Sequence, residues 1–417
     1  MYDHKKLYEL VESRRDQLLV LCSDLIRIPS VNPPGDVEEI VSYIAKFLET
    51  RDILCRVVRP VESAPNIIAE LGDPSSGKKL ILNGHCDVVP VGNLDKWDFD
   101  PFSGEIRDGK IHGRGASDMK CGLAGLLFAM GLLADEKISL QGQIILTVVP
   151  DEEVSGPWGT KWLVESGTIK GDAALIAEPT GYFNCEIGQK GCCWIKLKAY
   201  GEPAHGSLAP YTGGNAIDRL LKVLQHIHKI RDIVPRYDED TARLMEESRL
   251  MAKRLLKAPG AQHVLNHCTV NIGKINGGTK VNMVPDYAEA EIDVRLPLGV
   301  SCEMVEEMLL MIISESCIDG IKYEFGWKSE PNGTDQKAAI VEAVAQNVRR
   351  VWGETLNRTY QWASSDARFF RYAGIPTLQY GPANLEGIHA YNETVNVQDV
   401  VNATKIYTGA IVDYLNS

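Results

Sequence analysis

The sequence has no long apolar run, no surplus of basic residues and no Cys-x-x-Cys pair. No apolar stretch approaches the roughly 20 residues that a membrane-spanning helix needs, which argues against an integral membrane protein. Lys and Arg number 44 against 56 Asp and Glu, giving a formal net charge of -12. Nucleic acids and anionic membranes attract basic surfaces, so neither is expected as the main partner.

The cysteines and the N-terminal segment predict a cytoplasmic protein. None of the 10 cysteines forms a Cys-x-x-Cys pair, and a chain of 417 residues does not need disulfides to hold its core, so we expect reduced thiols. Residues 1–28 mix charged side chains with apolar ones at helical spacing, which predicts one amphipathic helix and not the apolar segment of a secretory signal.

The length predicts two domains, or one large domain with an insertion. Up to residue 188, and again from 330 to 417, predicted strands alternate with predicted helices. This alternation is typical of an α/β domain with a mixed, mostly parallel sheet flanked by helices. The stretch 144–149 is a continuous apolar and β-branched run of the kind that forms a strand buried on both faces.

The pattern changes near Gly188, which predicts an inserted domain over residues 189–329. Its predicted elements follow in the order strand, helix, two strands, helix, strand, at residues 193–200, 215–230, 269–274, 283–296, 302–315 and 323–327. This is the order of a split βαβ, ferredoxin-like α+β unit.

Acidic residues and histidines gather where predicted strands of the α/β domain end. They are His85 and Asp87, Asp118 in a glycine-rich turn, Glu152 and Glu153, Glu178, and His389. In an open α/β sheet the functional crevice borders the carboxyl ends of the strands, so we expect these side chains to converge. A single acidic residue after a strand is ordinarily a turn or helix-cap residue. That explanation is weak for the whole set, because so many such residues would rarely fall at strand ends by chance.

The residue types in this set are those that bind a pair of metal ions. Two histidines and three carboxylates, one of them bridging, form the ligand mix expected for two borderline cations such as zinc. Hydrolysis also needs a general base that is not a ligand, and the adjacent Glu152 and Glu153 offer one residue for each role. Asp87, two residues after His85, is suited to orient the imidazole of a ligand.

These motifs resemble the acetylornithine deacetylase and succinyl-diaminopimelate desuccinylase family, within the wider group of aminoacylases and glutamate carboxypeptidase. The resemblance covers nearly the whole chain, with the motifs in order. It implies a role for each residue of the set: His85 and Glu178 on one metal, Glu153 and His389 on the other, Asp118 as the bridge, Glu152 as the base and Asp87 as the orienting acid. It also implies a cis peptide bond between Asp118 and Met119.

The resemblance further implies that residues 189–329 form a lid and dimerisation domain. His205, within Pro203-Ala204-His205-Gly206-Ser207, would stabilise the oxyanion in the partner subunit's site. Asn282, Arg295 and Arg368 would contact substrate, the first arginine as a carboxylate clamp. A surface or cap role for His205, and pairing with a structural carboxylate for either arginine, remain open alternatives.

The sequence thus predicts a homodimeric hydrolase that uses water and two divalent cations to cleave the amide bond of an N-acyl amino acid. Zinc is the first choice of metal, with cobalt or manganese as alternatives. A dipeptidase or carboxypeptidase with the same metals is the nearest rival, since it differs only in the pocket. A non-catalytic interaction protein and a phosphoester hydrolase are more remote alternatives. Residues 361–363 and His112 depart from the family pattern and leave the substrate open.

Overall fold

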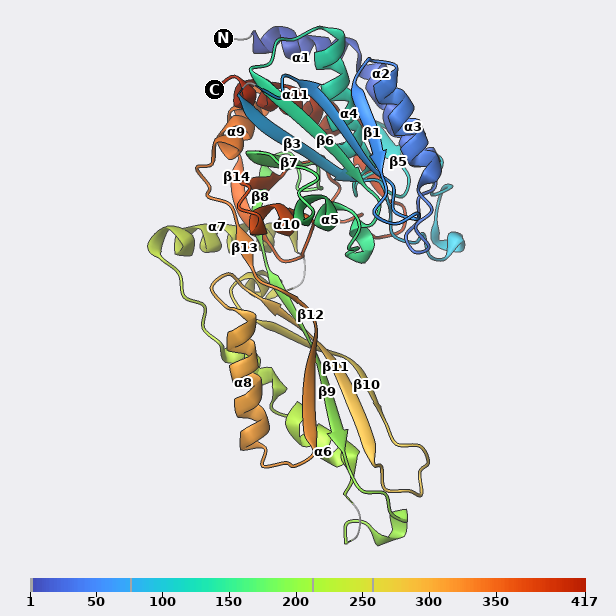
Figure 1. Cartoon of the computed structure of the whole chain (residues 1–417), viewed down its shortest axis with the longest axis vertical. Helices are drawn as coiled ribbons and strands as arrows, with labels where there is room; N and C mark the ends of the chain where they lie inside the picture. The colour runs from blue at the N-terminus through green and yellow to red at the C-terminus, as the bar shows by residue number, and fades with distance from the viewer. Residues whose placement is uncertain (1–2, 76, 212–213, 257–258) are drawn as a thin grey trace. The chain divides into compact units, whose positions relative to one another are not determined.

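The computed structural model describes residues 3–75, 77–211, 214–256 and 259–417. The chain forms two compact units, and Figure 1 labels most of their helices and strands. Unit 1 comprises Met1–Ile187, Gly333–Arg358 and Ser365–Ser417, and unit 2 comprises Gly188–Asn332 and Thr359–Ser364. Unit 2 is therefore built mainly from one continuous segment that interrupts the sequence of unit 1.

Unit 1 is built on a nine-stranded sheet in the order β1-β2-β6-β3-β7-β15-β8-β13, with β14 paired to β8. The bounds are β1 Leu54–Val58, β2 Asn66–Gly72, β3 Lys78–His85, β6 Gly142–Val149, β7 Ala173–Ile176, β8 Asn184–Gln189, β13 Asn332–Gly333, β14 Asn357–Gln361 and β15 Thr377–Gln379. The central strands β6, β3, β7 and β15 are parallel, whereas β2 and β8 join them antiparallel. The sheet is mixed, as predicted, with parallel pairing among its central strands.

Helices pack along this sheet (Figure 1). Their bounds are α1 His4–Ser13, α2 Arg15–Arg27, α3 Glu38–Glu49, α4 Lys120–Asp135, α5 Thr160–Glu165, α9 Ala339–Trp352, α10 Ala367–Tyr372 and α11 Val397–Leu415. Helix α4 contacts β3, α2 and α11 and is buried on all sides from Lys120 to Leu133. A Cβ added to Gly122 would lie 2.3 Å from the carbonyl oxygen of Ala177, so only glycine lets α4 approach the end of β7 this closely.

The prediction of one helix over residues 1–28 is wrong, because the helix is broken at Arg14. Helix α1 ends at Ser13 and α2 begins at Arg15, while Arg14 itself has φ -109° and ψ 19°. The Arg14 guanidinium pairs with Asp135 and Glu136 at the end of α4. These tertiary ion pairs fix the break, and helical spacing of apolar residues continues on both sides of it. No helix among the described residues is long and apolar enough to cross a membrane.

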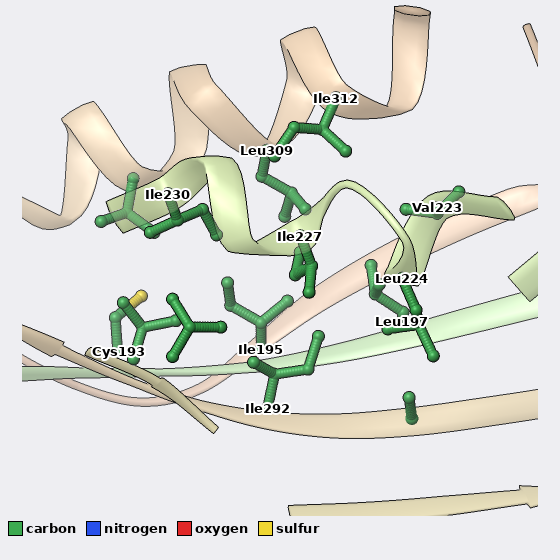
Figure 2. Packing of buried hydrophobic residues seen from close by; sticks show 14 of the residues in the cluster. Cys193, Ile195, Leu197, Val223, Leu224, Ile227, Ile230, Ile292, Leu309 and Ile312 are labelled. Atoms are coloured by element: carbon green, nitrogen blue, oxygen red, sulfur yellow. The ribbon is translucent and has the colours of Figure 1, made fainter. Parts of the chain in front are cut away.

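Unit 2 contains a four-stranded antiparallel sheet in the order β10-β11-β9-β12. The bounds are β9 Gly191–Tyr200, α6 Ala216–Leu224, α7 Glu239–Leu255, β10 Thr269–Gly277, β11 Tyr287–Leu296, α8 Cys302–Glu315 and β12 Ile321–Ser329. Apart from α7, the element order and strand pairing are those of a split βαβ unit. Ile195 and Ile292 point from the sheet toward Ile227 and Leu309 and form a buried core with them (Figure 2).

A small third sheet, which the sequence did not predict, joins distant parts of unit 1. It has the order β16-β5-β4, with β4 Ile106–Arg107, β5 Lys110–His112 and β16 Thr394–Asn396. Strands β16 and β5 pair antiparallel, with Thr394 opposite His112. This pairing places the chain just after His389 beside the loop that leads to Asp118.

Candidate metal centre

The parallel strands at the centre of unit 1 bring most of the predicted ligands to one edge of the sheet. His85 is the last residue of β3, Glu153 follows β6 and Glu178 follows β7, and β6, β3 and β7 are neighbours. Asp118 lies directly before α4, in a loop where the Asp118–Met119 peptide bond is cis, as the family resemblance implies. His389 lies in the loop before β16 with φ 58°, a left-handed conformation that is uncommon for a residue with a side chain.

The five side chains form two groups that share Asp118. In the first, His85 Nε2 lies 3.2 Å from Asp118 Oδ1 and 3.9 Å from Glu178 Oε1. In the second, His389 Nε2 lies 3.2 Å from both Asp118 Oδ2 and Glu153 Oε2. Within each group, one potential ligand atom per residue lies within 4.8 Å of the others. The division is the one that the family resemblance implies, while the role of these residues as metal ligands stays a prediction.

The donor atoms of both groups fit a zinc-like cation. Two ligands bonded at about 2.0–2.1 Å to one tetrahedral zinc ion are about 3.3 Å apart, close to the 3.2 Å separations found here. Imidazole nitrogens and carboxylate oxygens are also the ligand types that such a cation accepts. Glu153 Oε1 is buried without a hydrogen-bond partner among the described residues, an arrangement that is costly unless a cation or water satisfies it.

The electrostatics of the centre indicate that positive charge is needed there. Burial, together with neighbouring carboxylates, raises the pKa of Glu152 and Glu178 well above the ordinary value. Burial opposes the ionisation of Asp118, but hydrogen bonds from His389 and His85 outweigh it and lower the pKa of that carboxyl. Hydrogen bonds to Asp118 and Glu153 raise the pKa of His389 to about 10. So many carboxylates can remain ionised together only when cations offset their mutual repulsion.

Asp87 lies behind His85 and supports three residues of the centre. It is fully buried, and its Oδ1 atom lies 3.4 Å from His85 Nδ1, which also contacts the Asp87 carbonyl oxygen at 2.9 Å. Because Nδ1 faces two oxygens, it would carry the proton when a cation is bound, and the Nε2 lone pair would then be available to a cation shared with Asp118 and Glu178. The Asp87 carboxylate also accepts the backbone N–H groups of Glu152 and Glu153.

Two supporting residues were missed by the sequence analysis. Asn32 donates from Nδ2 to Asp87 Oδ2 at 3.0 Å and to the Pro150 carbonyl oxygen at 3.3 Å. Glu393 is fully buried and accepts backbone N–H groups of the loop that carries Asp118. Neither lies at a recognisable spacing from the residue it contacts, so the sequence contained no signal for these pairings.

Glu152 belongs to neither ligand group, although it follows the same strand as Glu153. It lies in a short 3₁₀ turn, Glu152–Val154, and its backbone N–H is held by Asp87. It directly precedes Glu153 in the sequence, and the Glu178 carboxylate adds to burial in raising the pKa of its carboxyl. A carboxylate next to a candidate ligand and outside both groups is suited to accept a proton from water.

Arg368 is the one predicted substrate residue that lies in unit 1. It is 2% exposed, donates from Nη1 to the Ser365 carbonyl oxygen at 2.7 Å, and stacks over the Phe369 ring at 4.2 Å. These contacts hold the start of α10 in place. Its contact with substrate stays a prediction.

The other three predicted residues lie in unit 2. His205 is exposed and caps the turn Gly206–Leu208 by accepting the Ser207 N–H at Nδ1, while Gly206 donates to the Asn282 carbonyl oxygen at 2.9 Å. Arg295 donates from Nε to both Asp293 carboxylate oxygens, at 2.9 and 3.1 Å. The cap made by His205 and the ion pair made by Arg295 are the structural alternatives to their functional roles. The functional roles of His205, Arg295 and Asn282 therefore stay predictions.

Comparison with known proteins identifies relatives along the whole chain. The family model of peptidase family M20/M25/M40 matches residues 81–413. An N-formyl-4-amino-5-aminomethyl-2-methylpyrimidine deformylase from Halalkalibacterium halodurans is 28% identical over 430 residues, which cover 96% of this chain and 95% of the relative. A probable succinyl-diaminopimelate desuccinylase from Staphylococcus epidermidis is 26% identical over 412 residues, which cover 97% of this chain and 99% of the relative.

A solved structure shares the fold. The crystal structure of an M20 family metallo-carboxypeptidase from Sulfolobus solfataricus superposes with a TM-score of 0.78 at 22% identity, covering 96% of this chain and 99% of that chain. This match confirms the predicted fold class, and the match to the desuccinylase confirms the predicted family resemblance. Because the family model covers most of the chain, the chain belongs to peptidase family M20/M25/M40 and is a metal-dependent hydrolase of amide bonds.

Proposed function

We propose that the chain hydrolyses the amide bond of an N-acyl amino acid at a centre for two divalent cations, zinc in the first instance. Residues 1–188 and 330–417 form the catalytic domain in this proposal. The observation that carries it is the pair of ligand groups that share Asp118, with Glu152 adjacent to Glu153 in the sequence and outside both groups. His85 and Glu178 would hold one cation, and Glu153 and His389 would hold the other. Asp118 would contribute one carboxylate oxygen to each.

In this proposal the side chains of the site move the protons of the reaction. The cations, when bound, polarise the scissile carbonyl and lower the pKa of water. Glu152 accepts a proton from the attacking water as its oxygen bonds to the carbonyl carbon. Glu152 then donates that proton to the amine nitrogen as the C–N bond breaks, which releases a carboxylic acid and an amine. Asp87 keeps His85 oriented throughout.

The relatives support amide hydrolysis with more than one choice of substrate. The desuccinylase is named for an N-acyl amino acid, the deformylase for an N-formyl amine, and the carboxypeptidase for peptides. We propose an N-acyl amino acid because the desuccinylase, which is named for such a substrate, matches 97% of this chain. A dipeptidase or carboxypeptidase is the second candidate, since its metal centre would be the same.

A substrate comparison tests this assignment. The protein is loaded with zinc, cobalt or manganese, and kcat/KM is measured for N-acetyl- and N-succinyl-amino acids, an N-formyl amine and dipeptides. We expect at least one N-acyl amino acid to exceed every dipeptide by about 10-fold or more, because a single lost pocket contact costs about that factor. A dipeptide or the formyl amine as best substrate contradicts the assignment, and no turnover with any metal favours the non-catalytic alternative.

We further propose that the protein is a cytoplasmic homodimer in which residues 189–329 act as lid and dimerisation domain, and His205 serves the partner subunit. All ten cysteines lie among the described residues and are free thiols, which supports a reducing compartment. Exposed His205 and its neighbour Asn282 are available to a second chain.

Subunit mixing tests the role of His205. His205→Ala and Glu152→Ala chains are each expected to be inactive, because each lacks one group needed at every site. After exchange, mixed dimers contain one site with both groups intact, so we expect up to about half of the wild-type activity per mixed dimer. Verified exchange without any recovery of turnover contradicts the proposal that His205 acts in the partner.

A further inference from the structure

Glu393 and Arg114 form a buried ion pair that lies next to the metal centre and belongs to neither ligand group. Glu393 is fully buried and Arg114 is 2% exposed. Arg114 Nη1 donates to Glu393 Oε2 at 2.7 Å. Isolated charges are rarely buried, so a pair at this depth needs hydrogen bonds on its remaining donors and acceptors.

The Glu393 carboxylate satisfies three backbone N–H groups of one loop. Oε1 accepts from Ser117 at 2.8 Å and from Asp118 at 3.0 Å, and Oε2 accepts from Gly115 at 3.2 Å. Converging N–H groups of this kind form an anion site in a loop, which here is filled by a side chain of the same protein. The bond to the Asp118 N–H fixes the backbone of the residue that both ligand groups share.

Arg114 fixes two further segments of the centre. Its guanidinium donates to the Ala390 carbonyl oxygen at 3.1 Å and to the Pro90 carbonyl oxygen at 3.4 Å, and it lies 5.2 Å from the centre of the Trp97 ring. Ala390 directly follows His389. The ion pair therefore connects the loop of Asp118 with the loop of His389, although the two are about 270 residues apart in the sequence.

We propose that the Glu393–Arg114 pair is a positioning element that holds Asp118 and His389 in the geometry needed to bind the two cations. The proposal rests on the metal centre described under the proposed function. Glu393 contacts no substrate or reacting atom in this account, and it acts through the backbone of the bridging ligand. Residues that support ligands in this way typically change metal affinity by about 10–100-fold when replaced.

Glu393→Gln tests the proposal because the change is isosteric. The amide nitrogen of glutamine would replace one of the two carboxylate oxygens. It would then face two N–H donors, either those of Arg114 and Gly115 or those of Ser117 and Asp118. Those two donors would lose their hydrogen-bond acceptor. We expect the affinity for zinc, measured by competition with a chelator, to fall by about 10–100-fold. The rise in Tm that saturating zinc produces over the metal-free protein is expected to shrink, since it depends on that affinity.

Glu186→Gln is the matched control. Glu186 is a buried carboxyl of unit 1, on β8 beside Arg371, and it contacts none of the proposed ligands. We expect the zinc affinity and the zinc-induced rise in Tm of this variant to stay at the wild-type level. A purely structural role for Glu393 predicts the same pattern for both variants.

The outcomes separate the positioning role from the metal centre itself. If folded Glu393→Gln binds zinc as tightly as the wild-type protein, the positioning role is overturned and the proposed function still stands. If the wild-type protein itself binds no zinc, the proposed function is overturned. If Glu393→Gln does not fold, Arg114→Lys decides. Lysine keeps the positive charge but cannot bond to both Glu393 and Ala390 with one planar group. We therefore expect Arg114→Lys to lose zinc affinity, by less than Glu393→Gln. An unchanged zinc affinity in Arg114→Lys would overturn the positioning role.

Discussion

Replacement of Glu152 by Gln lowers kcat by about 10²–10⁴-fold in our account, with both cations still bound. Glu152 adjoins Glu153 in the sequence without belonging to either ligand group, so its carboxyl is available to carry the proton from water to the leaving amine. Glutamine has nearly the same shape and cannot accept that proton. The measurement is kcat on the best N-acyl amino acid, combined with the metal content of the same preparation.

Two further measurements show whether the effect of Glu152→Gln on kcat is specific to this residue. Glu186→Gln, the same chemical change at a buried carboxyl away from the centre, is expected to leave kcat within a few-fold of wild type. KM of Glu152→Gln is also expected to change little, because the base acts in the reaction and not in binding. A Glu152→Gln protein with full metal content and undiminished turnover contradicts the assignment of the base.

Asp118→Asn is expected to remove both cations together with the activity. Asp118 is the one residue common to both groups, with Oδ1 facing His85 and Oδ2 facing His389. An amide offers one weak oxygen where two charged ones are needed, so the loss of affinity should exceed the roughly 10–100-fold typical of a residue that only supports a ligand. Metal content after dialysis is expected to fall toward zero per chain, with turnover at background.

Glu178→Gln provides the comparison for Asp118→Asn. Glu178 belongs to the first group alone, so its replacement should weaken one cation and leave the Glu153–His389 group occupied. Equal loss from Glu178→Gln and Asp118→Asn, or retention of both cations in Asp118→Asn, contradicts the shared role of Asp118.

The convergence of the candidate ligands could be predicted from local patterns, whereas their division between two cations came from the family resemblance. His85, Glu153 and Glu178 each lie at or just after the end of a strand whose apolar residues mark it as buried, and parallel strands bring their carboxyl ends to one edge. The split βαβ order of unit 2 was also readable, since its strands alternate apolar and polar residues with period 2.

The supporting residues could not be predicted, because their partners are fixed only in the folded chain. Glu393 binds backbone N–H groups about 275 positions away, and a backbone group leaves no mark in the sequence. Asn32 reaches Asp87 across a loop, again without a characteristic spacing. The break at Arg14 was missed for the same reason, since its ion-pair partners lie at the far end of α4. Tertiary contacts outweighed local helical spacing there.

The substrate could not be predicted from the metal centre, for a physical reason. The metal centre acts on the amide group, which all of the candidate substrates share, whereas selectivity depends on pocket side chains around it. Arg368 and Arg295 have contacts within the protein that explain their positions without any ligand. The kcat/KM comparison therefore decides between deacylase and peptidase, and the metal centre alone does not.

The most direct test of the account is a crystal structure of the zinc-loaded protein with anomalous diffraction measured at the zinc absorption edge. We expect two anomalous peaks, one about 2.0–2.2 Å from ligand atoms of His85, Asp118 and Glu178, and one at the same distance from Asp118, Glu153 and His389. Zinc bound elsewhere, or absent from both groups at saturating concentration, would contradict the claim that these residues form a two-metal centre.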